Sequence, residues 1–505
     1  MTVLTGRRLA PDQELAAAEI ISAWKESRHI AFIGPAGCGK TTTIVAAIQQ
    51  LQRTKPPQGV KTGVLLMAPS HKALRVLKGQ WRGIKVTFLT TQKFSGVRAK
   101  PSFDTEKFGI FSPCTAQDRA IRFIRDNRIG LAIIDECSML ARDQAAIIEA
   151  ACRYGGAAVA FTGDPYQLPP VSNDEPEGGD DGPEYLPDPS GMAPQFLSAP
   201  STIRLETVHR YDGPIYKYAT SIRENWDRLA MAPRRSEDGG GSRICVVDHW
   251  QIGFIEHARQ TYERLGGSPA AKNLLDQMPR ALAYTNATVD SLTLALRVRL
   301  FGPEARERFM RDELISFPEY TVTYKDPEDQ PELDPDVIHS STDAVVLESR
   351  IVEVNEPAPA YRYKTEKLGI EREIPLSLSG RFQELTVQLI DADNSICKAG
   401  WGIQTVRTPI IGDTETRAQY SAMKTKLLRV KIKEDDDGWA PMKRWKTYFT
   451  RINSAFVMTV HKSQGSTFRH VYVSDDISRE RDRLKKNPLL YVSATRASES
   501  ITFER

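Results

Sequence analysis

The sequence predicts an α/β protein built on parallel sheets that helices cover on both faces. Apolar runs at Ile30–Ile33, Gly63–Ala68, Leu131–Ile134 and Ala157–Thr162 alternate with segments of helical periodicity. Continuous apolar runs of this length are typical of parallel strands buried on both sides. A glycine-rich loop follows the first run and opens a helix, and a second set of the same pattern begins after residue 200. Two α/β domains are therefore expected.

Length and composition bound the class of protein. At 505 residues the chain is too long for one core, and about three or four domains are expected. The chain has 40% hydrophobic and 26% charged residues, and its net charge of +4 says little about partners. No apolar run is long enough to cross a bilayer, and no signal peptide is predicted. The six cysteines form no C-x-x-C pair, so neither a zinc site nor a disulfide framework is expected, and an intracellular soluble protein is predicted.

The first site candidate is the loop after the first apolar run. Its residues are Gly34, Pro35, Ala36, Gly37, Cys38, Gly39, Lys40 and Thr41. This is the G-x-x-x-x-G-K-[ST] pattern between a strand and a helix, and it is typical of polyphosphate binding. Lys40 is expected to reach the β- and γ-phosphates, and the Thr41 hydroxyl to bind Mg²⁺. The alternative is a glycine-rich turn without a ligand.

Two later apolar runs end in groups suited to phosphoryl chemistry. Asp135 and Glu136 follow Leu131–Ile134, at the end of a predicted parallel strand, where ligands bind in open sheets. Asp135 is expected to hold Mg²⁺ and Glu136 to polarise the attacking water. Gln167 follows Ala157–Thr162 and can hydrogen-bond both a γ-phosphate and water. The alternatives are a solvated strand end and a proline-stiffened turn.

The order of elements predicts the domain boundaries. Residues 1–94 and 129–202 form the first α/β domain, interrupted at 95–128 by a small insertion that contains a hairpin and a helix near 115–127. The second comprises 203–300 and 451–505. Its segment 234–243 is expected to be a flexible loop, and so is the acidic stretch 172–195. Residues 301–450 are predicted to be an inserted, mainly β domain.

These segments, taken in order, resemble the motifs of superfamily 1 DNA helicases. Residues 34–41, 135–139 and 163–171 are similar to motifs I, II and III. The other matching segments are the Q-motif region at 9–13, motif Ia at 66–73, motif Ib at 90–94, the motif IV segment at 205–210, motif V at 457–468 and motif VI at 491–497. The residues of motifs III and V resemble those of the group B branch. Enzymes of this branch move 5′→3′ and include Dda-like and RecD-like enzymes.

The resemblance implies two RecA-like domains with ATP between them, and an insertion in the second domain that is in part SH3-like. It implies that Gln13 reads the adenine edge and that Thr42 and Gly465 complete the nucleotide site. Arg210 and Arg496 would come from the second domain to neutralise charge on the transferred phosphoryl group. For each arginine the alternative is a surface ion pair.

Nucleic acid is expected along the tops of both domains. The resemblance assigns phosphate contacts to Pro69, Ser70, His71, Lys72, Thr91, Thr459, His461 and Lys462. The 95–128 insertion lies where the family carries a strand-splitting pin, so Phe103 is a candidate to stack on a base, with a small core of Phe103, Phe108 and Phe111 as the alternative. A basic run from Lys424 to Lys433, with a strand over 428–433, is either a solvated face or a further contact.

The predicted function is an ATP-dependent DNA helicase that uses ATP and Mg²⁺, acts as a monomer on single-stranded DNA and forks, and works in the cytoplasm of a bacterial or phage-infected cell. Two alternatives stay open. One is a translocase or RNA helicase that does not separate DNA duplexes, and the other is a binding module switched by ATP without productive turnover.

Overall fold

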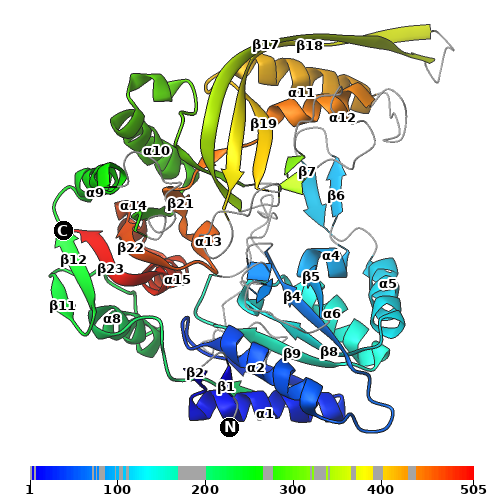
Figure 1. Ribbon diagram of the computed structural model, residues 1–505, viewed down its shortest axis with the longest axis vertical. Coiled ribbons are helices and arrows are strands. Elements are labelled where there is room, and N and C mark those ends of the chain that lie inside the picture. The colour runs from blue at the N-terminus through cyan, green and yellow to red at the C-terminus, as the bar shows by residue number, and fades with distance from the viewer. Residues whose placement is uncertain are drawn as a thin grey trace. The chain divides into compact units, whose positions relative to one another are not determined.

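The computed structural model describes residues 3–4, 7–70, 73–74, 77–78, 86–96, 98–101, 106–109, 113–168, 201–264, 277–318, 321–322, 337–338, 342–364, 371–390, 402–429 and 440–505. The chain forms two compact units (Figure 1). The first comprises Met1–Trp250, Pro279–Asn286 and Thr459–Arg505, and the second comprises Gln251–Met278 and Ala287–Met458.

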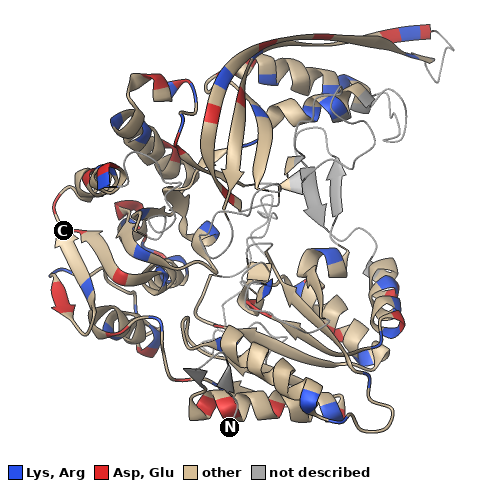
Figure 2. Cartoon of the chain, in the orientation of Figure 1, with Lys and Arg blue, Asp and Glu red and all other residues tan. Residues whose placement is uncertain are grey.

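The first unit contains a six-stranded sheet in which all strands are parallel. In spatial order its strands are β10 (Ser201–Arg204), β3 (His29–Ile33), β9 (Ala158–Gly163), β8 (Ile129–Ile134), β4 (Gly63–Ala68) and β5 (Thr87–Thr90). The four apolar runs of the sequence form β3, β4, β8 and β9, and none of these strands carries a Lys, Arg, Asp or Glu (Figure 2). Their burial on both faces explains why they are apolar throughout.

Helices cover both faces of this sheet. Ile30 and Phe32 share a core with α1 (Pro11–Glu26) and α2 (Lys40–Arg53). Ala31 and Ile33 pack on the opposite side with α4 (Thr91–Ser95), α5 (Pro113–Asp126) and α6 (Arg142–Gly155). The short strands β1 (Val3–Leu4) and β2 (Arg7–Arg8) pair antiparallel before α1. Because helices cover both faces of the parallel sheet, the predicted α/β class is confirmed.

The predicted insertion differs from the structure in one part. A hairpin of β6 (Arg98–Pro101) and β7 (Glu106–Gly109) is present, as expected. The helix that follows, α5, instead contributes Ala116, Ala120 and Ile124 to the core of the first sheet. It therefore belongs to the helical layer of that sheet and not to a separate subdomain. Likewise β10 ends at Arg204, so the first sheet passes the predicted boundary at 202.

A second sheet in the same unit places β23 (Ala497–Glu504) between β12 (Ser242–Val247) and β22 (Phe468–Val473), with β13 (Arg280–Ala283) beyond β22. These four strands are parallel. Helices α8 (Gly213–Glu224) and α15 (Arg483–Arg496) pack against each other and on this sheet. The short helices α13 (Val460–Ser463) and α14 (Asp475–Arg479) connect its elements. The predicted flexible loop at 234–243 is instead a hairpin, because β11 (Glu237–Gly239) pairs with β12 across a turn of three glycines.

The second unit is built on an antiparallel sheet with the order β19, β18, β17, β14, β20. The bounds are β14 (Leu314–Phe317), β17 (Thr342–Lys364), β18 (Glu371–Leu389), β19 (Ile403–Pro409) and β20 (Asn453–Ser454), with a separate pair of β15 (Thr321–Val322) and β16 (Val337–Ile338). The β domain expected at 301–450 is thus present, but it carries helices as well. The SH3-like assignment stays a prediction.

Two helices cover one face of the long β17–β18 hairpin, which Figure 1 shows as an extended ribbon. Ile374, Leu376 and Leu378 alternate with exposed residues on β18 and share a core with α11 (Thr414–Arg429) and α12 (Ala440–Lys446). The predicted strand over 428–433 is wrong at its start, because residues 428–429 end α11, and residues 430–433 lie outside the described part of the chain. Helices α9 (Trp250–Arg264) and α10 (Asn286–Phe301) complete the main helices.

A buried ion pair ties α10 to the segment before β14. Arg297 Nε lies 2.5 Å from Glu313 Oε1, and both side chains are buried. The guanidinium also donates to the Arg308 carbonyl at 2.7 Å, and Glu313 Oε2 accepts from the Met310 N–H at 2.9 Å. Both carboxylate oxygens of Glu313, and Nε and Nη2 of Arg297, are thus hydrogen-bonded inside the protein, and buried ions are tolerated when they are paired in this way.

We predict that Arg297→Met destabilises the second unit by about 3–5 kcal/mol, because the Glu313 carboxylate would stay buried without its cation. Urea denaturation, monitored by tryptophan fluorescence, measures the change in the free energy of unfolding. The control is Arg308→Met, which removes only an exposed ion pair with Glu304 and should cost less than about 1 kcal/mol. Equal losses of unfolding free energy in the two variants would contradict a stabilising role of the buried pair.

Candidate nucleotide and nucleic-acid site

The loop between β3 and α2 has the geometry of a phosphate cradle. Gly37 and Gly39 adopt left-handed backbone angles, with φ of 83° and 81°. A Cβ on Gly39 would lie 2.3 Å from Gln13 Nε2, and one on Gly37 would lie 2.5 Å from the Arg210 Cβ. Both positions therefore require glycine for conformation and for space. Thr42, in the first turn of α2, is exposed.

Lys40 lies inside this loop. Its side chain is buried, and Nζ donates to the carbonyls of Gly34 at 2.9 Å and Pro35 at 3.1 Å. Burial opposes its charge, but nearby anionic groups, including the carboxylates of Asp164, Glu136 and Asp135, outweigh this effect and raise the pKa of Lys40. The loop thus holds a charged ammonium next to its backbone N–H groups, as polyphosphate binding requires.

Asp135 lies at the carboxyl end of β8, in hydrogen-bond contact with the first turn of α2. Thr41 Oγ1 donates to Asp135 Oδ2 at 3.2 Å, and the Glu136 N–H donates to Oδ1 at 3.0 Å. Burial, followed by the neighbouring Glu136, raises the pKa of Asp135 to about 6. Thr41 and Asp135 together offer a hydroxyl and a carboxylate, which are hard oxygen ligands of the kind that Mg²⁺ prefers.

Glu136 and Gln167 carry buried polar atoms without partners. Glu136 has a left-handed φ of 52° and begins the short 3₁₀ turn Cys137–Met139. Among the described residues, Glu136 Oε2 and both amide atoms of Gln167 have no hydrogen-bond partner, and Gln167 is 4% exposed. Leaving such groups unpaired costs about 1–3 kcal/mol each. Their presence is explained when a ligand supplies the missing partners.

Two arginines lie close to each other near this region, and Arg210 is next to Gly37 of the loop. Arg496, the last residue of α15, is 1% exposed and donates to the Ser466 carbonyl at 3.1 Å and to Thr495 Oγ1 at 3.2 Å. Arg210 donates weakly to the Thr495 carbonyl at 3.5 Å. Burial and then repulsion by Arg210 lower the pKa of Arg496 to about 10. Within the described part of the chain neither arginine forms an ion pair, so the alternative of a surface ion pair does not hold.

Gln13 braces the phosphate loop. Its Nε2 donates to the Cys38 carbonyl at 3.0 Å, and its Oε1 accepts from the Ala10 N–H at 3.0 Å. The neighbouring Asp12 accepts the N–H groups of Glu206 and Thr207, and these bonds outweigh its partial burial and lower its pKa. Sequence reasoning missed this role of Asp12, although it precedes Gln13 directly. Gly465 has a left-handed φ of 76° with open space around it.

The residues expected to contact nucleic acid divide into three groups. Ser70 and Lys462 are accessible, and His461 is half-buried, so that burial lowers its pKa. The Ser70 hydroxyl accepts the Ala73 N–H at 3.1 Å. Pro69, Thr91 and Thr459 are buried, and the Thr459 hydroxyl caps α13. Their contacts with nucleic acid stay predictions. His71, Lys72 and Phe103 lie outside the described residues.

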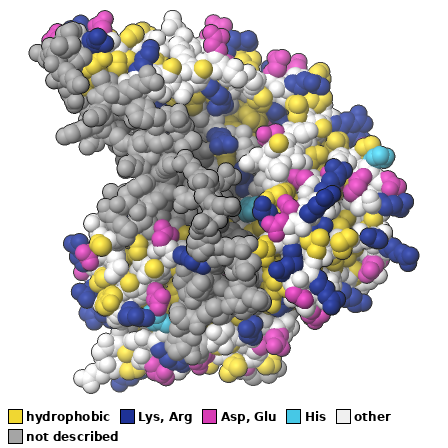
Figure 3. Space-filling model, turned by 180° about the vertical axis from the view of Figure 1, so that it is seen from behind, with side chains coloured by type: hydrophobic (Ala, Val, Ile, Leu, Met, Phe, Trp, Pro, Cys, Tyr) yellow, Lys and Arg dark blue, Asp and Glu magenta, His cyan; other side chains and the backbone are white. Residues whose placement is uncertain are grey.

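Charge does not single out one nucleic-acid face. Figure 3 shows basic and acidic side chains interspersed over the face that it presents, in keeping with the net charge of +4. No helix among the described residues is long and apolar enough to span a bilayer. The face shown in Figure 3 thus has no broad basic field among its described residues.

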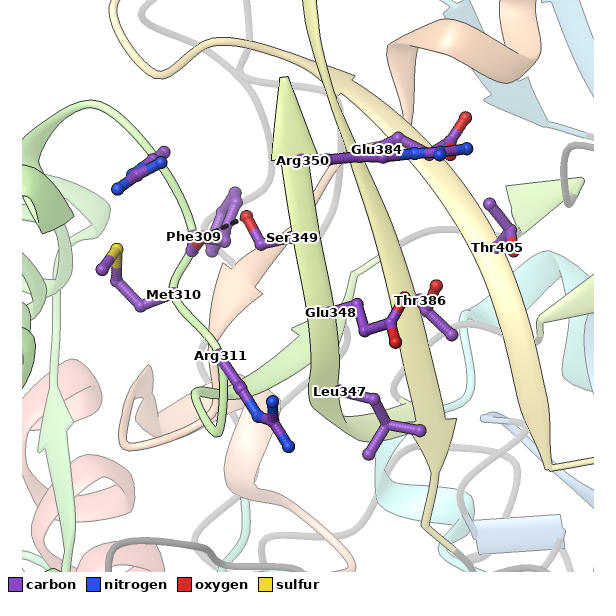
Figure 4. Close-up of a pocket in the computed structure, with 11 residues that line it drawn as sticks. Phe309, Met310, Arg311, Leu347, Glu348, Ser349, Arg350, Glu384, Thr386 and Thr405 are labelled. Atoms are coloured by element: carbon purple, nitrogen blue, oxygen red, sulfur yellow. Dashed lines mark hydrogen bonds and ion pairs between the residues drawn. The ribbon is translucent and has the colours of Figure 1, made fainter. Parts of the chain in front are cut away.

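A hollow lies in the second unit, beside β17. Its volume is 570 Å³, and its charged lining consists of Arg308, Arg311, Arg350, Glu348 and Glu384. Figure 4 shows Arg350 and Glu384 reaching toward each other from neighbouring strands, with Nε 2.6 Å from Oε1. The lining has mixed charge and lacks a glycine loop at a helix start, so it does not offer a polyphosphate site.

Comparisons with known proteins agree with the motif order. The family model described as an AAA domain matches residues 8–177, and the UvrD-like helicase C-terminal domain matches residues 454–502. "Uncharacterized protein R530" of Acanthamoeba polyphaga mimivirus is 22% identical over 97% of this chain and 98% of its own length. "ATP-dependent DNA helicase dda" of Enterobacteria phage T4 is 23% identical over 98% of this chain and 99% of its own length.

Solved structures of Pif1 helicases are also similar. The protein from Candida albicans covers 98% of this chain and 94% of its own at 16% identity and a TM-score of 0.46. Bacteroides Pif1 bound to ssDNA covers 98% and 92% at 15% identity and a TM-score of 0.43. The motif order, the two family models and the full-length match to the phage protein thus agree in the similarity of this chain to superfamily 1 helicases.

Proposed function

We propose that this chain is an ATP-dependent DNA helicase that hydrolyses ATP at the loop between β3 and α2 and moves 5′→3′ along single-stranded DNA. One observation carries the proposal. Buried Glu136 and Gln167 atoms without partners, and two arginines without carboxylates, lie around a phosphate loop with a charged lysine. A triphosphate together with the attacking water would satisfy these groups, because phosphate oxygens accept from the cations and from the Gln167 NH₂, and the water donates to Glu136 and to the Gln167 carbonyl. The phage T4 relative, whose name is "ATP-dependent DNA helicase dda", supports the DNA-dependent activity.

Each group has a proposed role in hydrolysis. Lys40 and the loop N–H groups bind the β- and γ-phosphates. Glu136 takes the proton of the attacking water, and Gln167 orients that water against the γ-phosphate. Arg210 and Arg496 neutralise the charge that develops on the transferred phosphoryl group. Mg²⁺, held by Thr41 and Asp135, would polarise the phosphate oxygens.

Electrostatic neighbours support this arrangement. Glu136 raises the pKa of Lys40 and acts in the same direction on the pKa of Arg496, so its carboxylate is in range of both cations. Lys40 begins α2, which packs on the first sheet. Arg496 ends α15, which packs on the second sheet. ATP bound at this point would bring charge to both sheets, so its hydrolysis would change the force between them.

The phosphate loop gives the first prediction. Lys40→Ala should lower ATP turnover at least about 1,000-fold, because the ammonium that binds the β- and γ-phosphates is lost, while single-stranded DNA binding persists. Steady-state ATP hydrolysis and fluorescence anisotropy with an oligonucleotide measure the two properties. The control, Lys55→Ala, removes an exposed lysine after α2. Turnover in Lys40→Ala close to that of the control would refute the site.

The buried Arg496 gives the second prediction. Arg496→Ala should lower kcat about 1,000-fold, the usual size of an arginine-finger effect, with a small change in ATP affinity. Rapid-quench kinetics and equilibrium nucleotide binding separate the two. Arg479→Ala, which removes an exposed arginine paired with Asp475, should leave both unchanged. A loss of affinity without loss of kcat would assign Arg496 to binding only.

Direction of movement is tested on duplexes with one single-stranded tail. We expect ATP-dependent unwinding of a duplex with a 5′ tail and little unwinding with a 3′ tail. Strand separation is followed by release of a fluorescent oligonucleotide, with Lys40→Ala as the inactive control. Unwinding only from the 3′ tail would overturn the direction. ATP hydrolysis without separation of any DNA duplex would favour the translocase or RNA-helicase alternative, which an RNA duplex in the same assay would distinguish.

A further inference from the structure

The turn that carries Gln167 contains an unexpected buried carboxylate, Asp164. It is 1% exposed and forms no ion pair in the described part of the chain. Its Oδ2 accepts the Ala36 N–H of the phosphate loop at 2.8 Å and the Tyr491 hydroxyl at 2.6 Å. Its Oδ1 accepts the Tyr166 N–H at 3.2 Å. Three hydrogen-bond donors therefore hold this buried carboxylate without a direct ion pair.

Tyr491 reaches this carboxylate from α15, the helix that ends in Arg496. Its side chain is fully buried, and burial raises the pKa of its hydroxyl well above the ordinary value, so it is a permanent donor at neutral pH. The hydrogen bond from Tyr491 to Asp164 thus connects α15 to the turn after β9, and Asp164 in turn accepts the Ala36 N–H of the phosphate loop. The Ala36 N–H also lies 3.4 Å from the Tyr491 oxygen.

A second contact holds the same turn. The Tyr166 ring packs edge-on against Trp226 at 5.0 Å and lies 6.2 Å from the Tyr491 ring. The Arg223 guanidinium lies 5.1 Å from the centre of the Tyr166 ring. Asn487 and Arg483 of α15 in turn bind the Trp226 carbonyl at 3.2 and 2.7 Å. The turn is therefore attached to α15 both directly and through the Trp226 segment.

The turn also sets the position of Gln167. Its N–H donates to the Asp164 carbonyl at 3.2 Å. Gln464, next to α13, donates to the carbonyl of the following Leu168 at 3.3 Å. The Gln167 amide makes no hydrogen bond with the described residues, so the placement of its backbone depends on these anchors.

We infer that Tyr491 is a positioning residue for ATP hydrolysis, which acts through Asp164 to hold the phosphate loop and the Gln167 turn in register with the helix that carries Arg496. The inference rests on the proposed function. The hydroxyl touches no reacting atom, but it fixes the distance between two groups that must meet the γ-phosphate together. Misplacement of such groups by about 1 Å lowers rates up to about 100-fold.

The test is Tyr491→Phe in the full chain, which removes one hydroxyl and keeps the ring. We expect kcat for single-stranded-DNA-stimulated ATP hydrolysis to fall about 10- to 100-fold, with KM for ATP within about threefold and the thermal midpoint close to wild type. This split identifies a group used in the transition state more than in binding. The matched control is Tyr218→Phe, which removes a hydroxyl that donates to the Met231 carbonyl and should leave kcat unchanged.

A double-mutant cycle guards against an unstable variant. Asp164→Ala removes the acceptor that the Ala36 N–H and the Tyr491 hydroxyl share. We expect Tyr491→Phe with Asp164→Ala to be no slower than the slower single variant, because the tyrosine acts only through this carboxylate. Additive losses, or a kcat of Tyr491→Phe within twofold of wild type, would overturn the inference. A wild-type chain that does not hydrolyse ATP would instead overturn the proposed function.

Discussion

Three parallel strand ends, those of β3, β8 and β9, lie side by side, and the nucleotide site depends on this adjacency. The Gly34 N–H donates to the Gly163 carbonyl at 3.1 Å, and Thr162 Oγ1 donates to Asp135 at 3.4 Å. A Cβ on Gly163 would come within 2.7 Å of Cys137 Sγ. The loop, the carboxylate pair and the Gln167 turn are thus packed so closely that none can move without the others. The apolar, doubly covered strands supply the rigidity that such a site needs.

The electrostatics of the site are unbalanced in a way that favours a triphosphate. Lys40, Arg210 and Arg496 carry positive charge, and burial, followed by repulsion from the neighbouring Glu136, raises the pKa of Asp135. If stability alone mattered, these charged side chains would be expected either in ion pairs or replaced by uncharged residues. Their retention is expected where a charged ligand completes the network, and Tyr491 with Asp164 extends that network from one sheet to the other.

Much of this site could be predicted from the sequence, since Lys40, Thr41, Asp135 and Glu136 follow apolar runs that are strands under any reading. Asp164 and Tyr491 could not, because their bond joins residues that are far apart in the chain and depends on packing. The burial of Pro69 and Thr91 could not be predicted either, since periodicity does not show which residues lie under others. The helix α5 was assigned to an insertion because its apolar face gives no sign of the sheet on which it packs.

The central claim is that ATP hydrolysis at this site is coupled to single-stranded DNA. The most direct measurement is the rate of ATP turnover by the wild-type chain with and without a long single-stranded oligonucleotide at saturating ATP. The account predicts that turnover rises at least about tenfold with the oligonucleotide, as closure of the two sheets becomes productive. A rate that is the same with and without DNA would contradict it.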